Sequence, residues 1–168
     1  MTDILVIGGG IAGLSAAALL SQLGEVRLLE RETALGYHTS GRSAALFEEC
    51  YGKPAVVALN RASHRYLAEE NGGVLSPRGL LMIAGDDLKA AFDADVAAME
   101  LHLIDKDKAL ALWPDLNPAS FTMAAYGAHA WDIDTDLLMQ NFAREVRSNG
   151  GMISTKAEVR AIRKAFSD

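Results

Sequence analysis

The chain opens with a short aliphatic run, then glycines, then a stretch rich in alanine and leucine. The run at 4–7 is continuous and partly β-branched, which predicts a strand buried on both faces of a parallel sheet. Residues 11–23 predict a helix that ends at Gly24, and residues 26–30 predict a second strand. Together these elements form a βαβ unit of the length that a right-handed crossover requires.

Helical and strand spacing continues along the rest of the chain. It predicts helices at 53–70, 86–99, 106–112 and 134–148, and strands at 79–84, 121–126 and within 152–164. In the last of these helices Leu138, Phe142 and Val146 share one face. Asp134 is placed to cap its amino-terminal end.

The polar stretch 31–52 separates the βαβ unit from the next helix. A loop of this length in a compact domain is usually functional. The helix that follows has an apolar face formed by Val56, Leu59 and Tyr66.

The composition narrows the class of protein. At 168 residues, the chain has room for one domain or for one domain and part of a second. It is 50% hydrophobic and 23% charged, as is typical of a soluble globular protein. Acidic residues outnumber basic ones by 22 to 16, and no long basic stripe is present. This charge balance argues against a nucleic-acid partner.

Residues 4–24 carry no charge and approach the length of a membrane span. Glycines at 8–10 interrupt this stretch, and Asp3 stands where a signal peptide would carry a positive charge. We therefore interpret it as a buried strand, a turn and a helix, and predict no transmembrane segment. The single cysteine, Cys50, fits a reducing compartment, so we predict a cytoplasmic protein, with peripheral membrane association left open.

Three glycines, Gly8, Gly10 and Gly13, form the pattern G-x-G-x-x-G between the first strand and the first helix. In a dinucleotide-binding turn, the first glycine permits the tight turn and the second lets a pyrophosphate approach the backbone. The third lets the helix lie close to the strand. The helix start at Ile11 and Ala12 offers N–H groups and a partial positive charge to the pyrophosphate.

Glu30 supports the dinucleotide interpretation. It stands about 20 residues beyond Gly8 at the end of the second strand, where a carboxylate can accept hydrogen bonds from the adenosine ribose hydroxyls. A P-loop would instead need a lysine after its last glycine, but Leu14 follows Gly13. Nucleotide hydrolysis is therefore disfavoured.

The histidines show no sign of a metal site in their spacing. His38, His64, His102 and His129 have no metal-ligand spacing with one another or with Cys50. We therefore predict no bound metal and assign the histidines to surface or supporting roles. The cysteine is a poor candidate for a catalytic thiol.

A second glycine-rich segment is more specific than the first. It reads Leu-Gly-Tyr-His-Thr-Ser-Gly-Arg-Ser-Ala-Ala at 35–45, follows Leu-Glu-Arg-Glu at 29–32, and is followed by Tyr51. With 75–78 and the helix entry at 132–136, it resembles the FAD-dependent oxidoreductases of the D-amino-acid oxidase (DAO) type. Among these it is most similar to bacterial D-amino-acid dehydrogenases of the D-arginine kind. The resemblance covers essentially the whole chain.

The resemblance implies an α/β fold with two domains. A Rossmann-like, doubly wound FAD-binding domain is interrupted in this family by an antiparallel-sheet substrate domain. By resemblance, 1–75 and 131–168 belong to the FAD-binding domain, and 76–130 to the substrate domain. Members of the family continue well past Asp168, so we expect this chain to be the amino-terminal portion of a longer enzyme.

The resemblance also implies FAD as the cofactor and assigns contacts to it. The glycines of the first turn would face the pyrophosphate, Glu30 the ribose and Arg31 the adenine side. Val159 matches a family valine whose backbone contacts adenine. A further set would run past the pyrophosphate and the isoalloxazine ring: Thr39, Gly41, Arg42, Ser43, Ala44 and Ala45.

For the chemistry, the resemblance implies hydride transfer from the substrate Cα–H to flavin N5, giving an imine that water hydrolyses to a 2-oxo acid and ammonia. No dedicated protein base is required if the amine arrives neutral. Tyr51 is the candidate side chain near the substrate. Members that take cationic D-amino acids place polar or acidic groups where this chain has Leu46 and Leu80. We therefore predict a neutral or apolar small-molecule amine as substrate, since a buried guanidinium without a carboxylate partner is costly.

Other functions share parts of this pattern. An NAD-dependent dehydrogenase would share 8–30 but has no need of 36–45. A non-catalytic nucleotide-binding fragment, or an FAD enzyme acting on sarcosine, glycine or a 2-hydroxy acid, also fits the sequence. Oxygen, a quinone and a partner protein all remain compatible as the electron acceptor.

Overall fold

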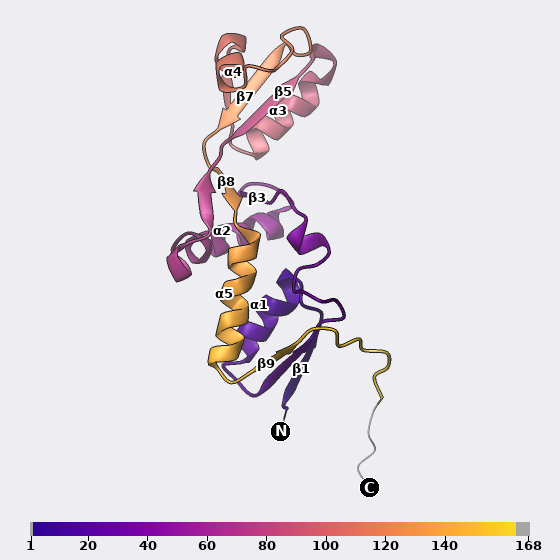
Figure 1. The fold of residues 1–168 in the computed structure, drawn as a ribbon. Helices are drawn as coiled ribbons and strands as arrows, with labels where there is room; N and C mark the ends of the chain where they lie inside the picture. The colour runs from indigo at the N-terminus through magenta and orange to yellow at the C-terminus, as the bar shows by residue number, and fades with distance from the viewer. Residues whose placement is uncertain (1, 164–168) are drawn as a thin grey trace. The chain divides into compact units, whose positions relative to one another are not determined.

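The computed structural model describes residues 2–163, which form two compact units (Figure 1). Of these residues, 2–44 and 134–163 form unit 1, and 45–133 form unit 2. Chain order in unit 1 runs β1 (Ile4–Ile7), α1 (Ile11–Leu20), β2 (Val26–Leu29), the 3₁₀ turn η1 (Thr39–Gly41), α5 (Thr135–Ser148) and β9 (Met152–Ser154).

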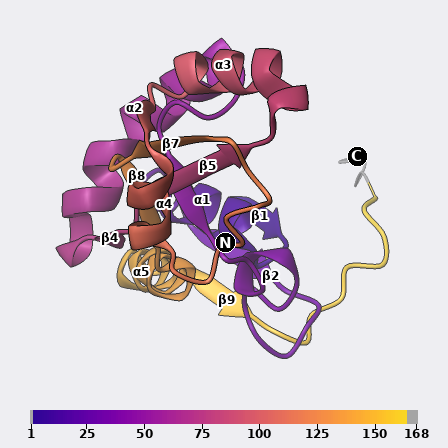
Figure 2. The same ribbon diagram turned by 90° about the horizontal axis from the view of Figure 1, so that it is seen from above.

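Unit 1 is built on a parallel sheet. Its strands lie in the order β1-β2-β9, with Ile4 opposite Val26 and Arg27 opposite Met152. The crossover from β1 to β2 contains α1, and α5 leads into β9. These two helices pack against each other, and Figure 2 shows α5 nearly end-on beside β9. This is the arrangement of one half of a doubly wound sheet, so the Rossmann-like α/β prediction is confirmed.

The core of unit 1 lies between the sheet and these helices. Val26, Leu28, Leu14 and Val146 are fully buried. The strand 4–7 is present as predicted, but its expected burial on both faces is wrong: Leu5 is 52% and Ile7 50% exposed. Side chains alternate across a strand, and among the described residues the helices cover only one face.

The last helix of unit 1 follows the prediction closely. Asp134 caps α5 by accepting a hydrogen bond from the Leu137 N–H at 2.8 Å. The predicted face at 138, 142 and 146 is buried. By contrast, α1 ends at Leu20 rather than 23. Residues 21–23 form turns, and the positive φ of a glycine cap occurs at Gly150 but not at Gly24.

Unit 2 contains two antiparallel sheets, in the orders β3-β8-β4 and β5-β7-β6. Its strands are β3 (Leu46–Glu48), β4 (Leu75–Pro77), β5 (Leu80–Ala84), β6 (His102–Ile104), β7 (Met123–Gly127) and β8 (Ala130–Ile133). Its helices are α2 (Pro54–Glu69), α3 (Lys89–Ala98) and α4 (Lys106–Leu112), with 3₁₀ turns η2 (Glu70–Gly72) and η3 (Asp86–Leu88).

Helices α3 and α4 pack against the sheet that contains β7. Neighbouring residues of β7 belong to different core clusters: Ala124 packs with Ala109 and Phe121, and Ala125 packs with Phe92 and Leu101. Because side chains alternate along a strand, these clusters cover opposite faces of the sheet. The sheet of β5, β7 and β6 is therefore covered on both sides within unit 2.

Helix α2 corrects one expectation. It forms at the predicted place, but it buries none of its residues, and Val56 and Leu59 of its apolar face are 44% and 68% exposed. The stretch 31–52 is not wholly loop, since it contains η1 and β3. Of the strands expected within 152–164, only β9 forms among the described residues, and residue 164 lies outside them.

The compact units divide at other points than the predicted functional segments. The units meet at 44/45 and 133/134, whereas the predicted FAD-binding and substrate segments meet at 75/76 and 130/131. The assignment of a function to each segment stays a prediction. Within the described range, no helix combines the length and apolar character needed to cross a membrane.

Candidate functional site

The first glycine turn forms where β1 ends. Gly8 has a φ of +103°, a conformation that favours glycine, and its N–H donates to the Leu29 carbonyl at 2.8 Å. A Cβ built on Gly13 would collide with the Gly8 carbonyl oxygen. Only glycine at 13 therefore lets α1 start this close to the turn, as the sequence pattern predicts.

The second glycine segment folds back onto the first turn. Gly36 N–H donates to the Gly9 carbonyl at 2.9 Å, and the Ser40 hydroxyl accepts a hydrogen bond from the Ile11 N–H at 3.0 Å. A Cβ on Gly41 would collide with the Gly36 carbonyl oxygen. Ser40 was not among the predicted site residues, although it stands inside the quoted segment and hydroxyl residues are typical partners of helix N-termini.

Glu30 connects the strands and the turn. Its Oε2 accepts from the Gly9 N–H at 2.6 Å, and its Oε1 accepts from the Glu32 N–H at 2.8 Å. Its backbone N–H donates to Ser154, and its carbonyl accepts from Ala157, each at 2.8 Å. Because the backbone holds the carboxylate on both oxygens, Glu30 is fixed before any ligand arrives, and its remaining lone pairs stay available to hydroxyl donors.

A cavity of about 280 Å³ opens beside Glu30. Four predicted FAD contacts, at Gly8, Glu30, Arg31 and Val159, line it together. The other lining residues are Ile7, Leu29, Ala157 and Glu158. The cavity lies at the carboxyl ends of β1 and β2, where open α/β sheets bind ligands. Ala157 and Glu158 were not predicted, because only the folded chain brings the segment after β9 to this edge.

Arg31, Glu32 and His38 form a charged cluster directly after β2. Arg31 Nη2 contacts Glu32 Oε1 at 2.8 Å, and His38 Nε2 lies 2.9 Å from the same oxygen. The hydrogen bond with His38, and then that with Arg31, lowers the pKa of the Glu32 carboxyl below its ordinary value. Arg31 is mostly exposed, so its guanidinium is accessible to a ligand as well as to Glu32.

The remaining loop residues assigned to the cofactor form an exposed strip of unit 1. The strip comprises Thr39, Gly41, Arg42, Ser43 and Ala44. The Arg42 guanidinium lies over the Tyr37 ring, 5.2 Å from its centroid, which holds the long side chain to one side. Ala45 belongs to unit 2, where its carbonyl accepts from the Ile133 N–H at 3.1 Å.

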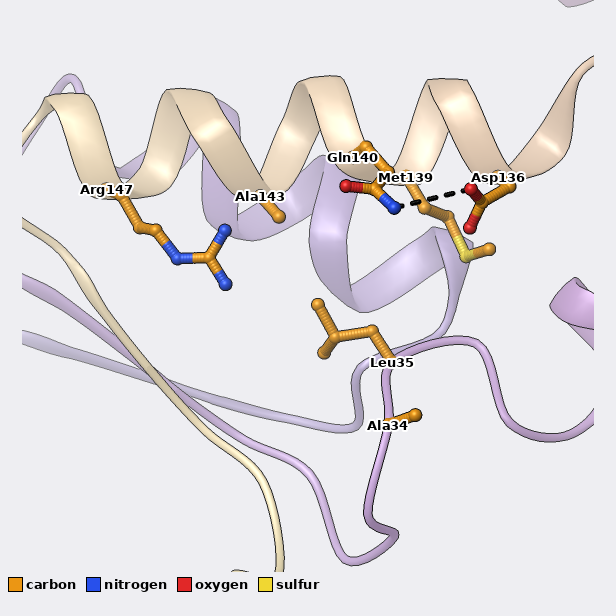
Figure 3. A pocket seen from close by; sticks show the side chains of 7 residues that line it. All are labelled: Ala34, Leu35, Asp136, Met139, Gln140, Ala143 and Arg147. Carbon is orange, nitrogen blue, oxygen red and sulfur yellow. Dashed lines mark hydrogen bonds between the residues drawn. The ribbon is translucent and has the colours of Figure 1, made fainter.

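Unit 1 has a second cavity, of about 260 Å³, between α5 and the loop at 34–35 (Figure 3). Leu35 and Met139 form its apolar part, and Arg147 lies toward one end. Gln140 Nε2 donates to Asp136 Oδ2 at 3.3 Å at the other end. None of the residues predicted to bind FAD lines this cavity, so the cavity at Glu30 is the better candidate for the adenosine end.

The residues predicted near the substrate all lie in unit 2. Leu46 and the exposed Tyr51 line one cavity of about 310 Å³ with Phe47, Val56 and others. Leu80 does not line that cavity; it packs on the cluster of Phe92, Leu101 and Ala125. The structure therefore brings Leu46 to Tyr51 within unit 2 and places Leu80 in the other sheet of that unit.

The comparison with protein families decides the class. The family model described as DAO, FAD dependent oxidoreductase, matches residues 3–167. The chain belongs to the DAO family. Since FAD is the cofactor of the DAO family, membership favours FAD over NAD for the cavity at Glu30.

One known protein is similar to this chain in sequence, and several solved structures are similar to it in fold. FAD-dependent oxidoreductase domain-containing protein 1 of Bos taurus is 24% identical over 173 residues, covering 89% of this chain and 35% of that protein. L-α-glycerophosphate oxidase of Mycoplasma pneumoniae with FAD bound matches with TM-score 0.81 and 21% identity over 94% of this chain and 45% of that chain. Glycine oxidase of Bacillus cereus matches with TM-score 0.79 and 21% identity over 98% of this chain and 50% of that chain. The DAO-family chain thus spans half or less of the length of these relatives.

The residues at the turn fit FAD. A Cβ on Gly8 would meet nothing within 4 Å, and one on Gly10 would meet only the Ser40 hydroxyl, so the backbone is open to a phosphate. The first amides of a helix have no partner inside it, and of these Ile11 is taken by Ser40. The amides of Ala12 and Gly13 stand next in the same turn and can face a pyrophosphate.

Proposed function

We propose that this chain binds the adenosine diphosphate part of FAD and belongs to an oxidoreductase that oxidises a small amine or D-amino acid. The observation that carries the first half is the cavity lined together by Gly8, Glu30, Arg31 and Val159 at the end of the parallel sheet. Glu30 would accept from the ribose, and the amides at the start of α1 would hold the pyrophosphate.

When bound, FAD supplies the acceptor for a hydride from the substrate carbon. In this proposal the chain orients the two reactants. Thr39, Gly41, Arg42, Ser43, Ala44 and Ala45 would follow the pyrophosphate toward the ring. Leu46 and Tyr51 share a cavity in unit 2 and would contact the substrate, Leu46 through its apolar side chain and Tyr51 through its hydroxyl.

Calorimetric titration tests the cofactor. FAD and NAD are titrated in parallel into the 168-residue chain. We expect binding of FAD but not NAD, weakened about tenfold or more by Glu30→Gln, which removes a charge-assisted acceptor. Glu145→Gln is the matched control, because Glu145 accepts from Gln22 at an exposed place in unit 1 and does not line the cavity at Glu30. Binding of NAD alone would overturn the proposal.

Gly10→Ala is a sharper probe of the pyrophosphate contact. Gly10 has a φ of −81°, which alanine adopts freely, and the added methyl would meet only the Ser40 hydroxyl, at 3.2 Å. The variant should keep its circular dichroism spectrum and lose FAD affinity, because the methyl stands where the phosphate approaches. Unchanged affinity in a folded variant would show that the pyrophosphate lies elsewhere.

A substrate panel tests the reaction, on a form of the protein as long as its structural relatives. Neutral and apolar D-amino acids, glycine, sarcosine, D-arginine, 2-hydroxy acids and glycerol phosphate are compared by flavin reduction. We expect reduction by a neutral or apolar amine, and Tyr51→Phe should raise KM more than it lowers kcat if the hydroxyl binds substrate. Robust turnover of D-arginine, or turnover of hydroxy compounds alone, contradicts the proposed substrate class.

A further inference from the structure

Three side chains with metal-ligating chemistry meet in unit 2. Glu48 ends β3, Cys50 follows it in a turn, and His129 precedes β8. Glu48 pairs with Ala130 in the β3–β8 register, which brings the adjacent His129 to it across the sheet. One potential ligand atom from each lies within 4.8 Å of the others, and His129 Nε2 lies 3.4 Å from Glu48 Oε1.

The carboxylate of Glu48 points to a missing ligand. Its side chain is 2% exposed. Oε1 accepts from the Cys50 N–H at 3.0 Å, but no described residue donates a hydrogen bond to the buried Oε2. Buried carboxylate oxygens are nearly always hydrogen-bonded or bound to a cation, because burying an unpaired charged group is costly.

The surroundings of the other two groups suit coordination. His129 Nε2 lies 2.9 Å from the Met99 carbonyl. A metal-binding histidine is oriented in this way through the nitrogen that does not hold the metal, so Nδ1 is the nitrogen left for coordination. Arg61 Nη2 lies 3.5 Å from Cys50 Sγ, so a cation already stands beside the sulfur. Arg61 also pairs with Glu100 at 3.0 Å, and it keeps that partner if the sulfur takes another.

We propose that Glu48, Cys50 and His129 bind Zn²⁺ with their carboxylate, thiolate and imidazole groups. Zinc takes all three ligand types in tetrahedral sites, whereas Mg²⁺ and Ca²⁺ prefer oxygen ligands and avoid thiolate. Three protein ligands leave a position for water. Cys50 also lines a cavity with Val57, Arg61 and Ala98. The proposal uses none of the residues assigned to FAD, but Glu48 also lines the cavity of Leu46 and Tyr51 that we assign to the substrate. Metal binding is therefore measured directly, without turnover.

Metal titration tests the site on the 168-residue chain after treatment with a chelator. Competition with a chromophoric chelator should show about one equivalent of tightly bound Zn²⁺, as four-coordinate sites hold. With Co²⁺ as the probe, a near-ultraviolet sulfur-to-metal absorption band should appear. Cys50→Ser should abolish this band. Cys50→Ser and His129→Gln should each weaken Zn²⁺ binding by roughly 100-fold or more, because the loss of a group that only supports a metal ligand already weakens binding by up to about 100-fold.

Two controls keep the test decisive. His102→Gln changes an exposed histidine of β6 in the same unit and should bind Zn²⁺ like the original chain. The sequence has a single cysteine, so labelling by a thiol reagent reports Cys50 without any substitution. Zn²⁺ should slow this labelling and a chelator should restore it. Unslowed labelling, or unchanged Zn²⁺ affinity in Cys50→Ser and His129→Gln, would show that the cluster does not bind the metal.

Discussion

Each unit has one notable carboxylate, Glu30 at the glycine turn of unit 1 and Glu48 beside Cys50 and His129 in unit 2. The two differ in how many of their oxygens accept a hydrogen bond. Both oxygens of Glu30 accept backbone amides, from Gly9 and Glu32. Only one oxygen of Glu48 has a donor among the described residues. The first carboxylate is therefore held by the backbone on both oxygens. The second keeps one buried oxygen without a donor in the described part of the chain, and this is the oxygen that our proposal gives to a cation.

The positions of the tryptophans allow the unfolding of the two units to be measured separately. Both tryptophans of the sequence, Trp113 and Trp131, lie in unit 2. Tryptophan fluorescence therefore reports unit 2, whereas far-ultraviolet circular dichroism reports the helices of both. A substitution that affects one unit alone should shift these two signals differently, provided that the units unfold independently.

The largest expected effect is on the glycine turn. Gly13→Val places a side chain into the Gly8 carbonyl oxygen, so α1 must move away from the turn. We expect unit 1 to lose about 3 kcal/mol of stability or more, the upper range for overpacking, and to lose FAD binding. Denaturation followed by circular dichroism measures the change.

Ala16→Val is the control for this substitution, because Ala16 is exposed on the same helix. It should cost less than about 1 kcal/mol, the difference in helix propensity. Equal destabilisation by the two valines would show that the close approach at Gly13 is not what fixes the turn.

The next effect concerns the cluster in unit 2. Glu48→Ala removes the acceptor of the Cys50 N–H and leaves that amide without its partner. Such a loss in a buried place costs about 2 kcal/mol. Urea denaturation followed by tryptophan fluorescence measures it. The neighbouring Glu49→Ala, which breaks a partly exposed pair with His64, should cost less than about 1 kcal/mol.

Helix caps offer a matched pair across the units. Asp134 accepts from the Leu137 N–H at 2.8 Å at the start of α5, and Asp105 accepts from the Lys108 N–H at 2.7 Å at the start of α4. Each substitution to alanine should cost about 1 kcal/mol. Asp105→Ala should shift the fluorescence transition, and Asp134→Ala only the dichroism transition. A shift of the fluorescence transition by Asp134→Ala as well would show that the units unfold together.

The smallest effect is the pH dependence of Glu32. Its pKa is lowered in the folded chain from the ordinary 4.5, chiefly by His38 and then Arg31. The stabilisation is therefore fully present above pH 4.5 and is lost as the pH falls through the lower pKa of the folded state. Acid titration of the stability of unit 1 should show a slightly steeper loss in the original chain than in Glu32→Gln. Identical slopes would show that these exposed contacts are screened by solvent.

The sequence alone predicted the helices and strands for which hydrophobic spacing, capping residues and chain breaks indicate the same limits. The helix 106–112 and the strand 4–7 appear with the predicted limits, and Asp134 caps α5 as expected. It missed β3, β4, β6 and β8 as separate strands, because runs of three or four residues are too short for a period of two to stand out. The start of α1 was predictable because glycine, helix start and strand end lie within a few residues of one another.

Only the tertiary structure decided which residues far apart in the sequence come into contact. The glycine pattern and Glu30 determined where a dinucleotide turn would form, since strand, turn and helix are consecutive. That Ser40 caps the start of α1, that Ala157 reaches Glu30, and that His129 meets Glu48 depend on strand register and on segments returning from far along the chain. Hydrophobic spacing identifies a face that can be buried, as in α5 and α2 alike, but only the folded chain determines that α5 is covered and α2 is not.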